Sequence, residues 1–313
     1  MLNLFKIKKM RNTKNFTITR KRFLKSLSIL SALTITPISY ASIDDRENVM
    51  KIKNNLNSNV DRLYILNGGL AIAPDQSMYT PGKFKDKPIT LTCNAYLIHR
   101  KGQWILWDTG INESVFEEIG GKIIAHGIRG VVVRPLVEQL ADIGLTPQDI
   151  DIVILSHAHF DHVGNAHLFQ NAKWYIQEEE YRAMFSPKYE DYGYLPQLYD
   201  FLEKKQIIMV NGDLDIFGDT SIRIISTPGH TPGHCSLMVR LKNKGIVILS
   251  ADVAHYKYNL EHLSVPQFNS NISDSIASMK KIEQIIATTN AKLWLNHDIK
   301  ASGIKRYAPA FYE

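Results

Sequence analysis

The sequence has few cysteines and, after its first residues, no long apolar segment. Cys93 and Cys235 are the only cysteines in 313 residues, too few for a disulfide framework. Both lie in apolar, strand-like runs, so we expect buried free thiols; a single bridge in an oxidising compartment is the alternative. Beyond about residue 42 no segment is long and apolar enough to span a membrane, so we expect no stable membrane anchor in the mature protein. Internal repeats and low-complexity linkers are also missing, and the length suits one large domain or two small ones.

Acidic residues are absent from positions 1–41, which carry nine of the 37 Lys and Arg residues. The remainder therefore holds 28 basic and 31 acidic residues, a net charge of −3, although the whole chain has a formal net charge of +6. This balance does not indicate a basic surface for nucleic acid, and we expect no nucleic-acid partner.

The basic start continues into "FLKSLSILSALTITPISYAS", a modest apolar stretch with small residues near Ser39 and Ala41. This pattern is typical of a cleavable export signal. We predict a signal peptide over 1–41, a linker over 42–59 and one folded domain over 60–313, in a protein exported to the periplasm or secreted. The stretch "TRKRFLK" resembles the twin-arginine signal, with Lys21 in place of the second arginine, and an ordinary Sec signal is the alternative.

The pattern of apolar residues predicts two groups of strands, each accompanied by helices. Strands are predicted at 62–72, 89–100, 103–110, 151–156, 173–177, 221–230, 234–252 (as a hairpin) and 292–298. Helical spacing is predicted in part of 112–143, in a turn after Thr146, in part of 178–204 and over 272–288. This order fits a mixed α/β fold, an αββα sandwich of two facing sheets with helices outside.

Seven residues of metal-ligand type stand at the ends of predicted strands. The stretch "SHAHFDHVGN" carries His157, His159, Asp161 and His162 directly after the apolar run "DIDIVIL". The other three are His230 in "STPGHTPGH", Asp252 in "VILSADVAH" and His297 in "LWLNHD". Imidazole and carboxylate groups bind borderline metals such as zinc. Because separate strands that end at one sheet edge can converge, these residues predict a metal centre; a polar surface turn is the alternative for the first cluster.

Together these motifs resemble the metallo-β-lactamase superfamily of metallohydrolases over roughly residues 60–313. The resemblance implies two zinc ions, or similar divalent metals, per chain. It implies that His157, His159 and His230 hold one metal, that Asp161, His162 and His297 hold the second, and that Asp252 bridges both. It also implies that Asp108, in "WDTG", lies behind the site and orients ligand residues or their loop. His234 does not match a ligand position, and we expect it to pack or to support a ligand.

Within the superfamily the chain most resembles the N-acyl-homoserine lactonases, through "CNAYLIHRKGQWILWDTGIN", "STPGHTPGHCSLMV" and "NHDI". The resemblance implies that a metal-bridging hydroxide opens the lactone ring, with Asp161 passing a proton to the leaving oxygen. The implied partner is a small ester or lactone substrate. The sequence does not decide between a monomer and a homodimer. One position departs from the pattern, because the lactonases carry a tyrosine three residues after the bridging aspartate and this chain has His255.

Because of His255, the sequence does not determine which class of substrate the protein hydrolyses. "ADVAH" is closer to the organophosphate hydrolases of the superfamily, so a phosphotriester or aryl-ester hydrolase is one alternative, and a non-catalytic metal-binding protein on the same scaffold is another. We predict that His255 is catalytic and donates a hydrogen bond to the substrate; a passive pocket wall is its alternative. Surface or ordinary hydrogen-bonded positions are expected for His99, His126, His167 and His262. "QEEEY" (177–181) is expected to be a solvated helix start.

Overall fold

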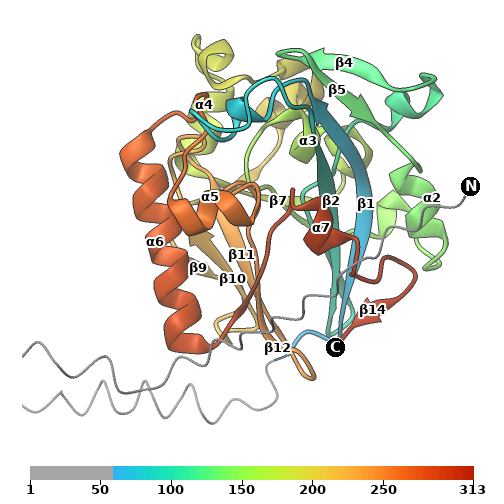
Figure 1. Ribbon diagram of the computed structural model, residues 1–313. Coiled ribbons are helices and arrows are strands. Elements are labelled where there is room, and N and C mark those ends of the chain that lie inside the picture. The colour runs from blue at the N-terminus through green and yellow to red at the C-terminus, as the bar shows by residue number, and fades with distance from the viewer. Residues whose placement is uncertain (1–58) are drawn as a thin grey trace, which may run out of the picture. The chain divides into compact units, whose positions relative to one another are not determined.

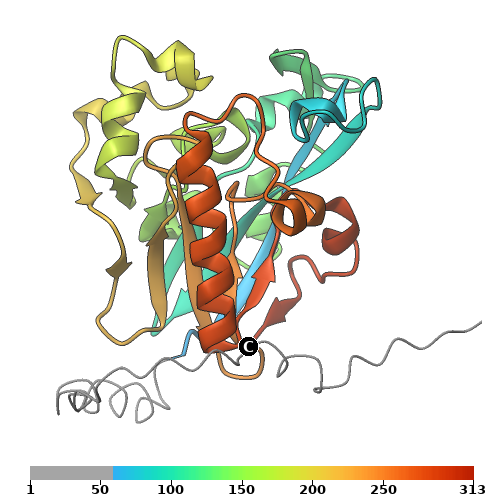
Figure 2. The same ribbon diagram turned by 60° about the vertical axis from the view of Figure 1, so that its left-hand side comes forward.

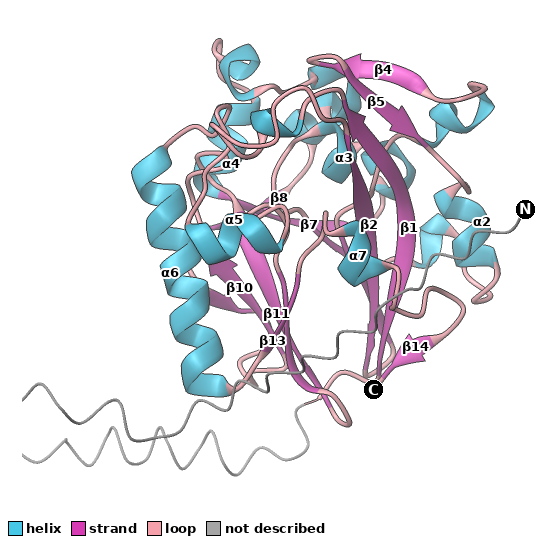
Figure 3. Ribbon diagram, viewed as in Figure 1, coloured by secondary structure: helices cyan, strands magenta, loops and turns pink. Residues whose placement is uncertain are grey.

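Two β-sheets face each other, and helices cover the outer face of each (Figures 1 and 3). The computed structural model describes residues 59–313. The predicted signal peptide and all but the last residue of the predicted linker lie outside the described residues. Among the residues described, no helix combines the length and the apolar composition that a membrane crossing requires.

The larger sheet has nine strands in the described part of the chain. In spatial order they are β4 (Lys122–Ala125), β5 (Ile128–Val131), β1 (Arg62–Ala73), β2 (Ile89–Arg100), β3 (Gln103–Trp107), β6 (Ile152–Ile154), β7 (Lys173–Gln177) and β8 (Ile207–Val210), with β14 (Phe311–Tyr312) paired to β1. Strand β3 is parallel to β6, so Asp108 and His157 follow strands that end at the same edge.

The smaller sheet has five strands over the same range. Their order is β13 (Lys292–Trp294), β12 (Gly245–Leu249), β11 (Cys235–Leu241), β10 (Ile222–Ser226) and β9 (Leu214–Asp215). Because β11 is antiparallel to both β10 and β12, and β12 is parallel to β13, strands β10, β12 and β13 all end at one edge. His230, Asp252 and His297 follow those three ends.

The central core lies between the sheets. Side chains alternate across a strand, so Leu63 and Ile65 of β1 join this core and Leu66 packs on the outer face of the large sheet. Val247 and Leu249 of β12 meet the same central core from the small sheet. This apolar contact holds the two sheets together, and the predicted ligand residues follow the strands that end at the joined edges.

Helices cover the outer faces. The helices are α2 (Leu136–Ala141), α3 (Phe160–Val163), α4 (Glu178–Met184), α5 (Lys257–His262), α6 (Ile272–Thr289) and α7 (Ile299–Ser302). Short 3₁₀ turns are η1 (Gln76–Met78), η2 (Glu113–Glu117), η3 (Pro147–Asp149), η4 (Ala166–Phe169), η5 (Tyr189–Tyr192), η6 (Pro196–Leu198) and η7 (Asp200–Lys204).

Helix α6 lies along the small sheet (Figure 2), where Met279 and Ile282 pack with Ile248. On the large sheet, Leu140 of α2 and Met184 of α4 pack with Leu66. The predicted αββα architecture is confirmed.

The element boundaries follow the sequence patterns closely, with one omission. Strands β2 and β7 span the predicted ranges, and α6 is one residue longer than predicted. The segment predicted as partly helical over 112–143 also contains the β4–β5 hairpin, which extends the large sheet by pairing with β1. Its turn is made by His126 and Gly127, both in the left-handed region (φ +50° and +75°), as a tight hairpin turn requires.

Candidate metal centre

All seven predicted ligand side chains converge where the strand ends of the two sheets meet. His157 and His159 follow β6, and Asp161 and His162 lie in the first turn of α3. The loops after β10, β12 and β13 carry the other three, His230, Asp252 and His297. Six of the seven are buried and His159 is partly buried. The topology therefore brings together residues that are up to 140 positions apart in the sequence.

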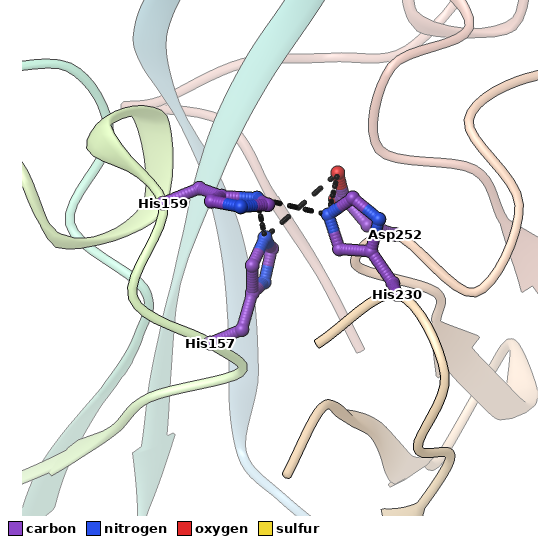
Figure 4. A group of neighbouring side chains, drawn as sticks. All are labelled: His157, His159, His230 and Asp252. Atoms are coloured by element: carbon purple, nitrogen blue, oxygen red, sulfur yellow. Dashed lines mark hydrogen bonds and ion pairs between the residues drawn. The ribbon is translucent and has the colours of Figure 1, made fainter. Parts of the chain in front are cut away.

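Three imidazoles and one carboxylate form the first group (Figure 4). The Nδ1 atom of His159 lies 3.0 Å from Nε2 of His157 and 2.9 Å from Nε2 of His230. Asp252 Oδ2 lies 3.3 Å from Nε2 of His230. These four side chains direct nitrogen or oxygen atoms at a common point.

The second group shares Asp252 with the first. Asp252 Oδ1 lies 2.9 Å from Nε2 of His297 and 3.0 Å from Nε2 of His162. Asp161 Oδ2 approaches the same Nε2 atom of His297 to 3.7 Å. The two oxygens of Asp252 thus face different groups, an arrangement in which one carboxylate can serve two neighbouring ions.

The hydrogen bonds behind the imidazoles test whether these rings suit a metal. Four rings turn their other nitrogen to an oxygen that can only accept: His159 to the Tyr192 carbonyl (2.8 Å), His297 to the Thr92 carbonyl (2.7 Å), His230 to the Asn269 amide oxygen (2.9 Å) and His162 to the Asp108 carboxylate (2.8 Å). In the neutral ring the proton must sit on that outer nitrogen, so the inner nitrogen keeps a free lone pair. The donor set therefore fits a divalent ion such as zinc.

The charges in the site differ between the two groups. Burial lowers the pKa of His157 and His230 well below the ordinary value, and neighbouring histidines add to this effect. Burial also opposes charge on His162, but the carboxylates of Asp252, Asp161 and Asp108 outweigh it and hold the pKa of His162 well above the ordinary value. His157 and His230 of the first group are therefore neutral rings with free lone pairs. In the second group, His162 is surrounded by carboxylates that favour its charged form.

Asp108 occupies the supporting position that was predicted for it. Its carboxylate accepts hydrogen bonds from the Ser156 backbone N–H (2.7 Å), the Ser156 hydroxyl (2.8 Å) and His162. His234 also supports the site, because its Nε2 atom accepts a hydrogen bond from the backbone N–H of Asp252 at 2.9 Å. Asp108 thus orients the loop of the first motif, and His234 fixes the loop of the shared carboxylate.

The expectation of a solvated helix start at 177–181 is wrong for Glu180. The structure buries this carboxylate completely. It accepts hydrogen bonds from the N–H groups of Ala158 (2.9 Å) and Gly233 (3.0 Å) and from the hydroxyls of Thr231 (2.7 Å) and Tyr194 (2.5 Å). Glu180 therefore ties the His157–His159 loop to the His230 loop. A run of three glutamates at a helix start does not reveal which one turns inward.

Cys93 was not predicted near the site. Both cysteines are free and buried, as expected, but the Cys93 thiol lies 3.4 Å from Oδ2 of Asp161. Cys93, Asp161 and His297 are close enough to form a further cluster of ligand-type atoms. Cys93 lies on β2, 68 residues before Asp161, and no local motif connects the two positions.

His255 faces the shared carboxylate, with its Nε2 atom 3.2 Å from Asp252 Oδ2. Its Nδ1 atom is buried and has no hydrogen-bond partner in the described part of the chain. The neighbouring Tyr256 points away from the site, since its hydroxyl bonds to Thr80 and Gln76. Among the other histidines, His167 and His262 are exposed and His99 is partly buried beside Asp61, as expected for positions outside the site.

A cavity of about 320 Å³ opens above the two groups. Its apolar lining residues are Ala71, Met78, Leu91, Ala125, Ile128, Phe160 and Phe268. Polar residues that line it outside the seven include Tyr79, His126, Glu190, Asp191 and His255. No lysine or arginine belongs to this lining among the described residues. The cavity therefore suits an uncharged molecule with an apolar part.

Comparison with known proteins gives consistent matches. The family model described as the metallo-β-lactamase superfamily matches residues 89–257. An N-acyl homoserine lactonase from Bacillus sp. is 30% identical over 77% of this chain and 94% of the relative. The lactonase AttM from Rhizobium radiobacter is 33% identical over 56% of this chain and 68% of the relative. An N-acyl homoserine lactone hydrolase, solved with N-hexanoyl-L-homoserine at its catalytic metal centre, superposes with a TM-score of 0.71 at 26% identity, over 81% of this chain and 99% of that one.

Proposed function

Because this chain belongs to the metallo-β-lactamase superfamily and is a lactonase-like, metal-dependent hydrolase of ester bonds, we propose that it is an exported enzyme that opens the ring of an N-acyl-homoserine lactone or a similar lactone. The observation that carries the proposal is the placement of Asp252, whose two oxygens face two groups of imidazoles at the base of one cavity. Two zinc or similar ions would be held by His157, His159 and His230, by Asp161, His162 and His297, and by the shared Asp252.

Bound together, two such ions would supply a hydroxide nucleophile near neutral pH and polarise the substrate carbonyl. The chain's own residues do the rest. Asp161 accepts the proton of the hydroxyl group that has been added to the carbonyl carbon and passes it to the leaving ring oxygen. The Cys93 thiol, 3.4 Å away, restrains the Asp161 carboxylate. The outward hydrogen bonds of the ligand histidines keep the imidazole rings from turning.

The lining of the cavity supports a neutral substrate with an acyl chain. Met78, Leu91 and Phe268 offer apolar surface to such a chain. With Glu190 and Asp191 at exposed positions and no lysine or arginine in the described lining, a substrate carboxylate that extends along the cavity wall gains no ion pair with a lysine or arginine. We therefore expect β-lactams, which carry a carboxylate, to be poor substrates.

Export is part of the proposal and rests on the composition of residues 1–41. Cells that express the full chain should release a product lacking about 41 residues to the periplasm or medium. Changing Arg20 and Lys21 together to Gln should block a twin-arginine route and leave a Sec route working. Full-length protein retained in the cytoplasm would count against export.

A second candidate is a phosphotriester or aryl-ester hydrolase, which His255 favours.

The test is a panel of homoserine lactones, aryl esters, phosphotriesters and β-lactams on purified, metal-loaded protein, with and without chelator. Lactones should be turned over fastest, and Asp161→Asn should remove most of the activity. His255→Phe should cost about ten- to a hundredfold, the value of one hydrogen bond. His255→Tyr should keep or raise lactone turnover; no gain on any lactone, with phosphotriesters far faster in the wild type, would favour the second candidate.

A further inference from the structure

The wall of the cavity carries a buried phenol from a segment far from the metal-ligand motifs. Tyr79 follows η1, is 3% exposed, and lines the same cavity as Asp161, Asp252 and His255. Its ring packs edge-on against His255, with centroids 4.8 Å apart, and against Phe268 at 5.3 Å. These contacts with two other lining residues fix the ring at the edge of the site.

The hydroxyl of Tyr79 has no hydrogen-bond partner among the described residues, although the backbone around it is well held. The Tyr79 N–H donates to the Gln76 carbonyl (3.0 Å), and its carbonyl accepts from the Asn259 amide (2.7 Å). The neighbouring buried phenol of Tyr256 is different, because Thr80 and Gln76 satisfy its hydroxyl. The Tyr79 hydroxyl is not among the fully buried polar atoms that lack a partner, so it is accessible from the cavity that Tyr79 lines and is free to bond to a molecule held there.

The charge around Tyr79 decides how its hydroxyl can act. Burial raises the pKa of Tyr79 well above the ordinary value, and the carboxylates of Asp161 and Asp252 raise it further. The phenol therefore keeps its proton throughout the neutral and mildly alkaline range. It can donate a hydrogen bond and cannot act as a base.

Resting on the function proposed above, we propose that Tyr79 is a further catalytic residue that donates a hydrogen bond to the carbonyl oxygen of the bound ester. Negative charge grows on that oxygen during attack, and a donor already held in place there stabilises it without reorganisation. The cavity offers few such donors, because its described lining contains no lysine or arginine.

The test compares metal-loaded wild type with Tyr79→Phe, which keeps the ring and removes only the hydroxyl, and with Tyr256→Phe as the matched control. Metal content, thermal midpoint, kcat and KM on N-hexanoyl-homoserine lactone and phenyl acetate, and the Kd for N-hexanoyl-homoserine by calorimetry are measured. Tyr79→Phe should lower kcat about ten- to a hundredfold and weaken product binding about three- to tenfold, with metal content and thermal midpoint unchanged. Tyr256→Phe should lower the thermal midpoint and leave kcat within about twofold.

Each other result is decisive. If Tyr79→Phe stays within about twofold of wild type in both turnover and product binding, Tyr79 is a wall residue and the inference is wrong. If wild type turns over neither ester yet binds the product, and Tyr79→Phe weakens that binding, the hydrogen bond stands and the proposed hydrolase function fails. If wild type neither turns over an ester nor binds the product, both are wrong.

Discussion

The candidate metal-ligand residues depend on partners that would contribute no atom to the proposed metal site. Asp108, His234 and Glu180 act in this way, through hydrogen bonds to the loops that carry the ligands. Such outer partners commonly change metal affinity about 10–100-fold when they are removed. Glu180 is the strongest case, because its buried carboxylate joins a loop of each sheet through hydrogen bonds alone, with no ion pair to a cationic side chain within residues 59–313.

We expect Glu180→Gln to destabilise the protein and weaken metal binding. The amide that replaces one oxygen must face an N–H donor, of Ala158 or of Gly233, whichever way it is turned, so one buried N–H loses its acceptor. The free energy of unfolding should fall by about 1–3 kcal/mol, and metal affinity by about tenfold or more. Urea unfolding and metal titration measure both.

The matched control is Glu179→Gln, one position earlier in α4. Glu179 is exposed and, among residues 59–313, forms an ion pair only with Arg182 on the surface at 3.0 Å. Exposed pairs of this kind contribute little, so stability should change by less than about 0.5 kcal/mol. Equal behaviour of the two variants would show that the carboxylate of Glu180 is unimportant.

At the scale of elements, the segment after β13 combines a candidate metal ligand with an unusual buried charge. His297 follows the strand, α7 comes next, and Lys305 then turns back toward the small sheet, 5.2 Å from the ring centre of Trp294. The Lys305 ammonium is buried without a hydrogen-bond partner among the described residues. Burial lowers the pKa of Lys305 to about 8, and Asp298 offsets only part of this effect.

Lys305 should make the protein more stable as the pH rises. The pKa of Lys305 is about 8 when folded and 10.5 in the unfolded chain, so the folded state releases its proton first and stability rises between those values. Lys305→Met removes the charge and keeps most of the apolar stem. It should raise the unfolding free energy at pH 7 by about 1–2 kcal/mol, less than the full pKa difference implies, because the residue as a whole is only partly buried.

Urea unfolding at pH 7 and pH 10 measures this effect, with the exposed Lys300→Met as the control in the same segment. The advantage of Lys305→Met should shrink at pH 10, and Lys300→Met should match wild type at both values. An advantage that is the same at both pH values would mean that packing, not charge, explains it.

At the scale of the molecule, the proposed metal centre joins the two sheets. His157 and His159 belong to the loop after a strand of the large sheet, whereas His230, Asp252 and His297 follow strands of the small one. Ions at this junction would bind the folded state and not the unfolded chain. They would therefore stabilise both halves of the protein together.

Removal of metal should lower the thermal midpoint substantially. Saturation at 100–1,000 times Kd contributes about 2.7–4.1 kcal/mol per site, and each 1 kcal/mol shifts the midpoint of a protein of this size by about 2–4 °C. Chelation should thus lower the midpoint by about 6 °C or more, and added zinc should restore it. Elemental analysis should give two ions per chain; a midpoint indifferent to chelator, with no metal bound, would contradict the proposed centre.

The sequence by itself determined the architecture and the candidate ligands. Alternating apolar runs predicted strands such as β2 and β7 because a strand buried on one or both faces leaves a local pattern. The ligand candidates were visible for a related reason, since His157, Asp252 and His297 stand directly after such runs, and strand ends meet at a sheet edge. Both inferences need only short-range information.

The tertiary structure alone decided which other side chains reach the site. Glu180 and Tyr79 lie in segments whose local patterns indicate a solvated helix and a loop, and Cys93 lies inside an ordinary apolar strand. Their roles arise from contacts across 53 residues, between Glu180 and Gly233, or 68, between Cys93 and Asp161. The physical reason is that burial and hydrogen bonding at a sheet junction depend on which distant segments pack there, and no local spacing records that packing.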